Sequence, residues 1–221
     1  MQEPLSAAFM QGLIPPVPIK MTELPQNVAK WTICEPVANN AGGKTCAILD
    51  ESGGPISFTT STLRSPFDAA GYNDPEAIRV GICLDADNDL VEWCTELDAE
   101  ILKLCRQHSR KLFGRDVYLE SDLKPNYYSP LKQNEKYGNS LFKMKMNKSG
   151  KGAVRVWNKE GLPREMPESW QGLRIQARLV LKCLWTQSRN FGLTYEITDA
   201  MICSEAEPTA CPFTVDNTLM P

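Results

Sequence analysis

The stretch LRIQARLVLKCLWTQSRNFGLTYEITDAM, residues 173–201, decides the fold, because apolar and polar residues alternate on both sides of a short polar break. Alternation with a period of two is the pattern of a half-buried β-strand. We therefore expect strands over residues 173–186 and 191–201, joined as a hairpin by QSRN. One row of the first strand is apolar and should face the core: Ile175, Ala177, Leu179, Leu181, Cys183 and Trp185. The opposite row is Arg174, Gln176, Arg178, Val180, Lys182 and Leu184.

The same alternation predicts further strands upstream of this hairpin. Residues 141–147 and 153–158 form a second expected hairpin, closed by KSGKG. Shorter strands are expected at residues 31–37 and 44–50 around a glycine-bearing turn, at 56–62 and at 79–86.

One long amphipathic helix is predicted between these strands. Residues 88–114 place apolar side chains at spacings of three and four, with Asp87 or Asn88 available as N-cap and Gly114 as the stop. His108 lies on this helix, where a solvated or partly buried position fits better than a catalytic role. The following residues 120–139 contain two prolines and three tyrosines without an apolar period, so we expect a long loop.

A chain of 221 residues with 42% apolar content is long enough for one elaborated domain. The element order predicts a β-rich α+β fold. Residues 1–30 are rich in proline and are expected to be a flexible N-terminal arm, residues 31–203 the single domain, and residues 204–221 a C-terminal tail.

Several classes of chemistry find no support in the sequence. The eight cysteines include no CxxC pair and His108 is the only histidine, so neither a structural metal nor a cofactor is expected. The motifs GxxxxGK[ST], GxSxG and HExxH are absent, which argues against an enzyme. The acids of residues 85–89 leave Mg²⁺ or Ca²⁺ binding open, although they are better explained as capping the helix that follows.

No window holds the ~18 consecutive apolar residues that a membrane-spanning helix needs, and Glu3 and several prolines interrupt the first residues where a secretory signal would be basic and then apolar. We therefore expect no membrane partner and an intracellular location in the nucleus, the cytoplasm or a viral replication site. Cysteines at apolar positions agree with a reducing compartment.

Charge is strongly segregated along the chain, although the net charge is only −3. Residues 1–100 carry 5 Lys and Arg against 15 acids, whereas residues 124–189 carry 14 against 4. Residues 190–221 carry 5 acids and no Lys or Arg. A basic segment with a net charge of +10 therefore lies between acidic ones, and an anionic partner is expected for it.

The strand alternation gathers this charge on one face. Lys143 and Lys145 lie opposite Phe142, Met144 and Met146, while Arg155 and Trp157 lie opposite two valines. If the strands are neighbours, six residues form one basic face around an exposed indole: Trp157, Arg155, Lys143, Lys145, Arg178 and Lys182. The adjacent loop adds Lys124, Lys132, Lys136, Tyr127, Tyr128 and Tyr137. Lysine and arginine suit the phosphates of a single strand, and tryptophan and tyrosine suit its unpaired bases.

Each of these residues also has an ordinary structural explanation. Lys and Arg on a half-exposed strand are usually solvated, a loop tyrosine often covers the core, and Trp157 would be buried if the loop folded over it. The concentration of positive charge in one segment favours the joint interpretation. An acidic protein would be attracted by the same composition.

The pieces LRSPFDAAGY, LDAEILKLCRQHSRKLFG, YYSPLKQNEKYGNSLFKMKM and LVLKCLWTQSRNFGLTYEITDAMI, spread over residues 63–202, resemble a family of viral single-stranded DNA-binding proteins from phages and large eukaryotic DNA viruses. The resemblance implies an OB-fold-like five-stranded barrel, elaborated by one long amphipathic helix and a long loop, whose open face holds the strand. It also implies a non-enzymatic protein that protects single strands in replication, recombination or repair. Some phage members carry a strongly acidic tail, of which residues 204–221 are a weak version.

The sequence thus predicts sequence-tolerant binding of single-stranded DNA, with Trp157 as the first candidate contact and RNA left open. Replication proteins that contact the acidic segments are expected partners, and a homo-oligomer is left open. The alternative is a non-catalytic structural or interaction module whose basic face meets an acidic partner.

Overall fold

The computed structural model describes residues 25, 27–40, 42–71, 74, 76–134 and 138–204. Its two longest strands are β12 (Arg174–Gln187) and β13 (Asn190–Ser204), which pair antiparallel from Arg174↔Ser204 to Gln187↔Asn190. Ser188 in the connecting turn adopts a positive φ of 55°, the left-handed geometry that tight hairpin turns use. The hairpin predicted across QSRN is confirmed.

A β-bulge changes which side chains of β12 face the core. Leu181 pairs with Tyr195 and Cys183 with Thr194, so Lys182 is an extra residue opposite the neighbouring strand. Such an insertion reverses the alternation beyond it. Leu184 is therefore buried while Trp185 is partly exposed, and the predicted apolar row is wrong after Lys182.

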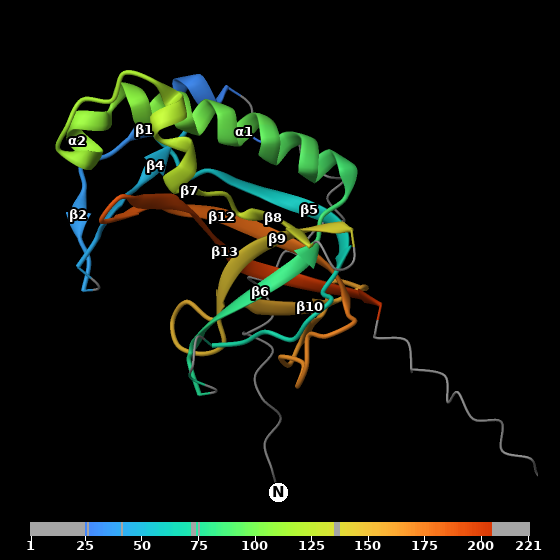
Figure 1. Ribbon diagram of the computed structural model, residues 1–221. Coiled ribbons are helices and arrows are strands. Elements are labelled where there is room, and N and C mark those ends of the chain that lie inside the picture. The colour runs from blue at the N-terminus through green and yellow to red at the C-terminus, as the bar shows by residue number, and fades with distance from the viewer. Residues whose placement is uncertain are drawn as a thin grey trace, which may run out of the picture.

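Further strands extend this hairpin into one curled sheet (Figure 1). Strand β5 (Ser57–Arg64) pairs with β12, and β9 (Asn139–Asn147) pairs with β6 (Arg79–Asp85). The two halves meet where Lys145 of β9 lies opposite Glu196 of β13. The protein is mostly β with few helices, as in an OB-like fold.

The shorter elements are η2 (Val28–Lys30), β1 (Thr32–Ile33), β2 (Val37–Ala38), β3 (Lys44–Cys46), β4 (Ile48–Leu49), η3 (Glu120–Asp122), η4 (Lys124–Asn126), β7 (Tyr127–Tyr128), β8 (Leu131–Asn134), β10 (Arg155–Asn158) and β11 (Pro163–Arg164).

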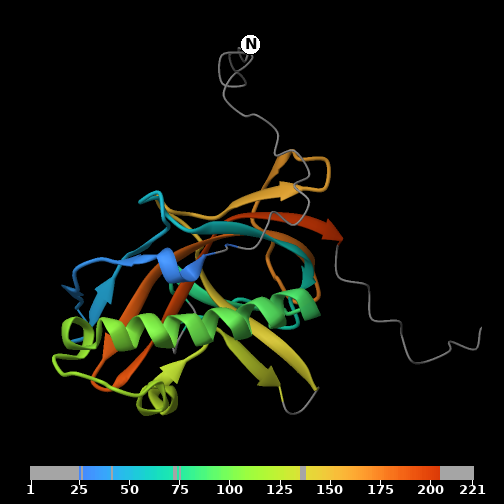
Figure 2. The ribbon, with the colours of Figure 1, turned by 90° about the horizontal axis from the view of Figure 1, so that it is seen from above.

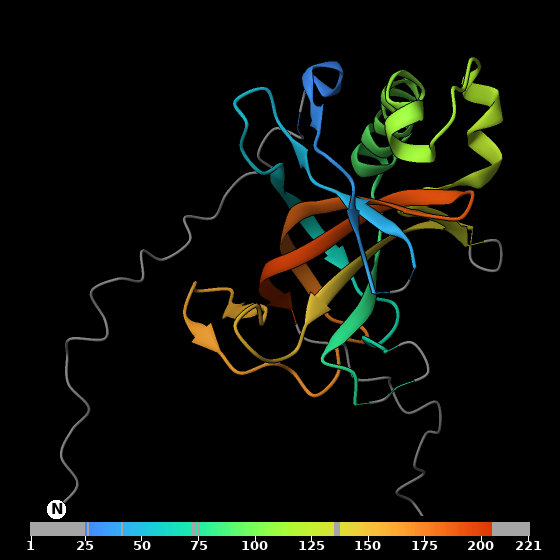
Figure 3. The ribbon, with the colours of Figure 1, turned by 90° about the vertical axis from the view of Figure 1, so that its left-hand side faces the viewer.

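Two predicted connections are wrong. Strand β10 does not pair with β9 across KSGKG; it runs parallel to β13 and antiparallel to β11. Figure 3 shows the amber β10–β11 hairpin at the end of the molecule opposite the helices. The expected loop over residues 120–139 contains η3, η4, β7 and β8, and its two strands join β13 and β9. The pairing of β7 and β10 with β13, which is distant in sequence, leaves no mark in the local composition.

The predicted helix is present as α1 (Asn88–Gln107) and α2 (Ser109–Phe113), separated at His108. The carboxylate of Asp87 accepts a hydrogen bond of 2.9 Å from the Leu90 amide, as expected of an N-cap. Gly114, at φ 70°, ends α2. Seen from above, α1 crosses several strands of the sheet (Figure 2).

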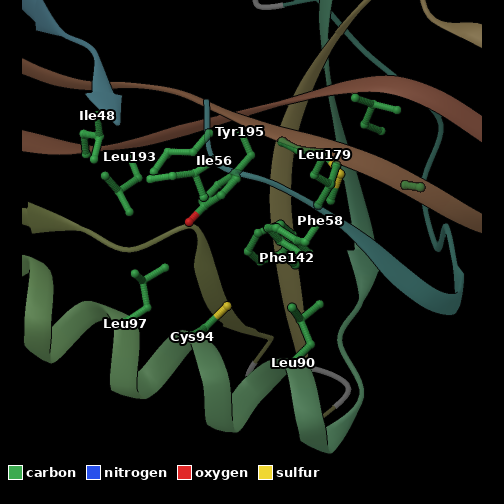
Figure 4. Packing of buried hydrophobic residues seen from close by; sticks show 14 of the residues in the cluster. Ile48, Ile56, Phe58, Leu90, Cys94, Leu97, Phe142, Leu179, Leu193 and Tyr195 are labelled. Atoms are coloured by element: carbon green, nitrogen blue, oxygen red, sulfur yellow. The ribbon is translucent and has the colours of Figure 1, made fainter. Parts of the chain in front are cut away.

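The main core lies between α1 and the sheet. Leu90, Cys94 and Leu97 point from the helix toward the strands, where Tyr195 and Phe142 are fully buried (Figure 4). The rings of Tyr195 and Phe142 have centroids 5.2 Å apart. This packing occupies the inner face of the sheet and leaves the opposite, outward face to solvent.

The described cysteines are free thiols. Burial raises the pKa of the Cys105 thiol to about 12 and that of Cys94 further, so both behave as apolar core residues. No cluster of three or more potential metal ligands occurs within the described ranges. Nor does any helix described there combine the length and apolarity of a membrane span.

The ends of the chain bear on the expected domain boundaries. Val28 of η2 is buried in the core, and the Trp93 indole donates to the carbonyl oxygen of Pro25 at 3.2 Å. Residues 25 and 27–30 of the expected N-terminal arm therefore contact the domain. Residues 1–24 of that arm and 205–221 of the expected tail lie outside the described residues.

Candidate nucleic-acid interface

A groove of about 470 Å³ opens on the outward face of the sheet. Strands β6, β9, β12 and β13 contribute to it, together with the segment from Tyr128 to Lys132. Its lining combines three lysines, Lys132, Lys143 and Lys145, with the aromatic side chains of Tyr128 and Trp185. The groove thus unites the two residue types that single-stranded nucleic acids require.

Strand β9 supplies two of the lysines. Its alternation buries Phe142, Met144 and Met146 and exposes Lys143 and Lys145, as predicted. The facing residues on β6 are small: Cys83 lies opposite Lys143 and Gly81 opposite Lys145. The Lys145 Nζ consequently lies over Gly81, 3.5 Å from where a β-carbon would stand.

None of the three groove lysines forms an ion pair with a described acid. Asp68 also lines the groove, and Lys132 lies close enough to Asp98 to lower the pKa of that carboxyl. Lys132 instead places its Nζ 5.4 Å from the ring centroid of Tyr128, within cation–π range. Three ammonium groups that are held in no ion pair make this groove attractive to phosphate oxygens.

The aromatic side chains form a contacting pair. The ring centroids of Tyr128 and Trp185 are 5.7 Å apart at an interplanar angle of 50°. Tyr128 is 47% exposed and Trp185 is partly exposed, whereas the other four tryptophans are buried. Sequence reasoning missed Trp185 because strict alternation assigned it to the core.

Gly192 allows the pair to form. It lies on β13 with Tyr128 as its partner on β7 and Trp185 as its partner on β12. A β-carbon at Gly192 would stand 2.5 Å from the Tyr128 carbonyl oxygen and 3.0 Å from the Trp185 ring. The absence of a side chain therefore brings β7 close enough for the two rings to touch.

Trp157 corrects the prediction of an exposed indole. Its side chain is only 7% exposed, and the indole Nε1–H donates to Asp199 Oδ1 at 3.2 Å. The same carboxylate holds the exposed Arg155, with Nε 2.8 Å from Oδ1 and Nη2 2.9 Å from Oδ2. Asp199 thus gives the indole a hydrogen-bond acceptor and neutralises the guanidinium.

Tyr127 is also committed to the fold. Its hydroxyl donates to Asp98 Oδ1 at 2.6 Å, and its ring packs 5.3 Å from that of Phe191. Burial and the neighbouring carboxyl raise the pKa of Tyr127 well above its usual range. Tyr127 anchors the segment that presents Tyr128, and its predicted role as a base contact stays a prediction.

The remaining residues that were predicted to contact nucleic acid differ in their exposure and in their contacts. Arg178 and Lys182 are exposed on β12, and Lys182 lies 4.0 Å from the carboxylate of Glu196. Lys124 is in η4. Lys136 and Tyr137 lie outside the described residues. The structure therefore gathers Lys132, Lys143, Lys145 and Tyr128 around one groove, and it places Arg155, Trp157 and Tyr127 in structural contacts.

Asp98 provides a test of how Tyr128 is held. Burial raises the pKa of this carboxyl, opposed by hydrogen bonds from Ser129 and Tyr127. A raised pKa means that the folded state binds the proton more tightly, so stability from this group is greatest below the unfolded pKa and falls as pH rises through the folded one. Asp98→Asn keeps an acceptor oxygen for Tyr127 without the buried charge.

We therefore expect the free energy of unfolding of Asp98→Asn to increase relative to that of the parent as pH rises from about 3 to 7, so that the variant becomes the relatively more stable protein. Urea unfolding at a series of pH values measures it. Asp98→Ala is the control: it leaves the Tyr127 hydroxyl without its partner and should destabilise at every pH by about 1–3 kcal/mol. A pH-independent difference between Asp98→Asn and the parent would contradict this account.

No protein-family model matches the chain, and no curated protein is similar to it in sequence. Solved structures of a phage protein are similar in shape. The single-stranded DNA-binding protein from bacteriophage Enc34 in complex with ssDNA has a TM-score of 0.47 and 13% identity, covering 80% of this chain and 98% of that chain. A second structure of the single-stranded DNA-binding protein from bacteriophage Enc34 has a TM-score of 0.46 and 14% identity, covering 80% of this chain and 93% of that chain. Its C-terminal truncation has a TM-score of 0.45 and 13% identity, covering 79% and 97%.

Proposed function

We propose that this protein binds single-stranded DNA with little sequence preference, in the groove between β6, β9 and the Tyr128–Trp185 pair. The observation that carries the proposal is the combination of three lysines that form no ion pair with a described acid and two solvent-accessible aromatic rings. Lysines meet the phosphates, and the rings stack on bases whatever their identity. No catalytic role is assigned to any residue.

The proposal extends to the fold, the family, the cellular role and the partners of the protein. Strands β5, β6, β9, β12 and β13 form the OB-type barrel, and its outward face carries the nucleic acid. Membership of the viral single-stranded DNA-binding family and action in replication, recombination or repair rest on the sequence resemblance and stay predictions. An intracellular location, predicted from the sequence features given above, also stays a prediction. Binding of RNA, contacts with replication proteins and self-association are equally predictions.

Fluorescence anisotropy of a labelled oligothymidine tests the proposed function. The protein is titrated at several salt concentrations, with the matching duplex and polyglutamate as competitors. Tight, salt-dependent binding with poor competition by both competitors supports the proposal. The bases of a duplex are already stacked on one another, and polyglutamate has no bases. Equal competition by polyglutamate would favour an interaction module for an acidic partner. No binding at low salt would refute the proposal.

The two lysines of β9 should set much of the salt dependence. Each phosphate contact on a single strand contributes about −0.7 to the slope of log affinity against log salt. We expect Lys143→Gln/Lys145→Gln to flatten the slope by about 1.4. Lys30→Gln/Lys103→Gln removes the same charge from lysines that are paired with Glu51 and Glu100. An equal change of slope in both double variants would show that net charge, and not the groove, is responsible.

A further inference from the structure

Glu196 occupies the centre of the outward face. Its side chain is only 13% exposed, although its neighbours are cations. Oε2 lies 3.3 Å from Arg79 Nη2, and Oε1 lies 4.0 Å from Lys182 Nζ and accepts from Asn147 Nδ2 at 3.3 Å. Strand pairing places Lys145 directly opposite it. Three polar neighbours on three strands therefore hold this carboxylate in place.

The outward face is consequently divided into two electrostatic regions. In the groove, Lys143 and Lys145 form no ion pair with a described acid, although Lys145 lies across from Glu196 in the strand pairing. Beyond the groove, Arg79 and Lys182 share the single negative charge of Glu196, and Arg155 is paired with Asp199. The boundary between the two regions coincides with Glu196.

We propose that Glu196 limits the affinity and the length of the bound strand, by competing with phosphates for Arg79 and Lys182. This inference rests on the proposed function. A phosphate that approaches either cation meets a fixed negative charge, and like charges in close contact oppose binding. The nucleic acid is thereby confined to the groove and does not continue along β12 and β13.

Asp199 differs from Glu196 in what its removal would do. Its two oxygens hold Arg155 in a bidentate pair and accept the buried Trp157 indole. Its loss therefore damages the fold. Glu196 has longer contacts to side chains that remain about half exposed, with Arg79 at 50% and Lys182 at 57%. Glu196 is therefore the acid whose neutralisation releases cations without dismantling the core.

Glu196→Gln tests the proposal, because it keeps the shape and an acceptor oxygen for Asn147 while removing the charge. We expect oligothymidine to bind roughly three- to thirtyfold more tightly at low salt, with a slope steeper by up to about 1.4 because two cations become available. Oligothymidines of increasing length should reach maximal affinity at a greater length than with the parent. Glu51→Gln, which releases Lys30 elsewhere on the surface, is the matched control.

A second substitution identifies the released cation. Lys182→Gln alone should change affinity little, since Glu196 competes with phosphates for Lys182. In the Glu196→Gln protein, the same substitution should remove about half of the gain in slope. Unchanged or weaker binding by Glu196→Gln, while the parent binds, would overturn the inference and leave the proposed function intact. Binding that is detected for Glu196→Gln but not for the parent would support the inference. If neither protein binds, the proposed function and this inference both fail.

Discussion

Replacement of both Trp185 and Tyr128 by alanine is expected to lower the affinity for oligothymidine by roughly 5- to 150-fold for each base that loses its stacking partner. The two rings form one contacting surface beside the groove lysines. Because no phosphate contact is lost, the slope of log affinity against log salt should stay unchanged. Anisotropy titrations at several salt concentrations separate this loss from that of the lysine variants.

Intrinsic fluorescence gives an independent measurement of the same contact. Among the five tryptophans, Trp31, Trp93, Trp157 and Trp170 are buried, which leaves Trp185 as the one that a base can reach. We expect oligothymidine to quench part of the emission of the parent and of Trp157→Phe. The quenching should vanish in Trp185→Phe. Quenching that persists there would show that the bases bind elsewhere.

Local patterns were sufficient for the elements that depend on near neighbours in sequence. Spacings of three and four predicted the helix, Asp87 and Gly114 marked its limits, and alternation placed Lys143 and Lys145 on the solvent side. The hairpin of β12 and β13 followed from two alternating runs around four polar residues. In each case the determinants lie within one turn of helix or one pair of strands.

The aromatic part of the site depends on interactions that alternation does not contain. One extra residue at Lys182 moves Trp185 from the predicted core row to the outward face. Trp157 lies on a predicted strand, but Asp199, which is distant in sequence, supplies the hydrogen-bond acceptor that keeps its indole buried. A bulge and a long-range hydrogen bond therefore exchange the roles of two tryptophans, and neither leaves a local signal.

The charge segregation predicted the right surface but not its detail. The basic segment does supply the groove lysines and most cations of the outward face. Residues 190–221 were counted as a separate acidic segment, yet Glu196 and Asp199 lie on β13 in the middle of that face. Counting by segment separated acids from the cations that they contact, because strand pairing brings the two segments together.

Trp157→Ala should mainly affect stability. Truncation of a buried tryptophan typically costs about 3–5 kcal/mol, and here Asp199 also loses a hydrogen-bond donor. We expect the free energy of unfolding, measured with urea, to fall by about that amount, while Trp185→Ala costs less because its ring is partly exposed. The two substitutions should therefore have opposite profiles, with stability lost at Trp157 and affinity lost at Trp185.

Trp157→Phe keeps this comparison possible if the alanine variant does not fold. It retains a buried ring but loses the donor to Asp199 and part of the indole's volume, and the loss of the donor alone should cost about 1.5–3 kcal/mol. Its affinity for oligothymidine, measured under conditions in which it is folded, should remain within about threefold of the parent, since an indole that is 7% exposed offers no face for a base. A large loss of affinity in a fully folded Trp157→Phe would mean that the indole becomes exposed when the strand binds, and the stacking site would then extend from the groove to β10.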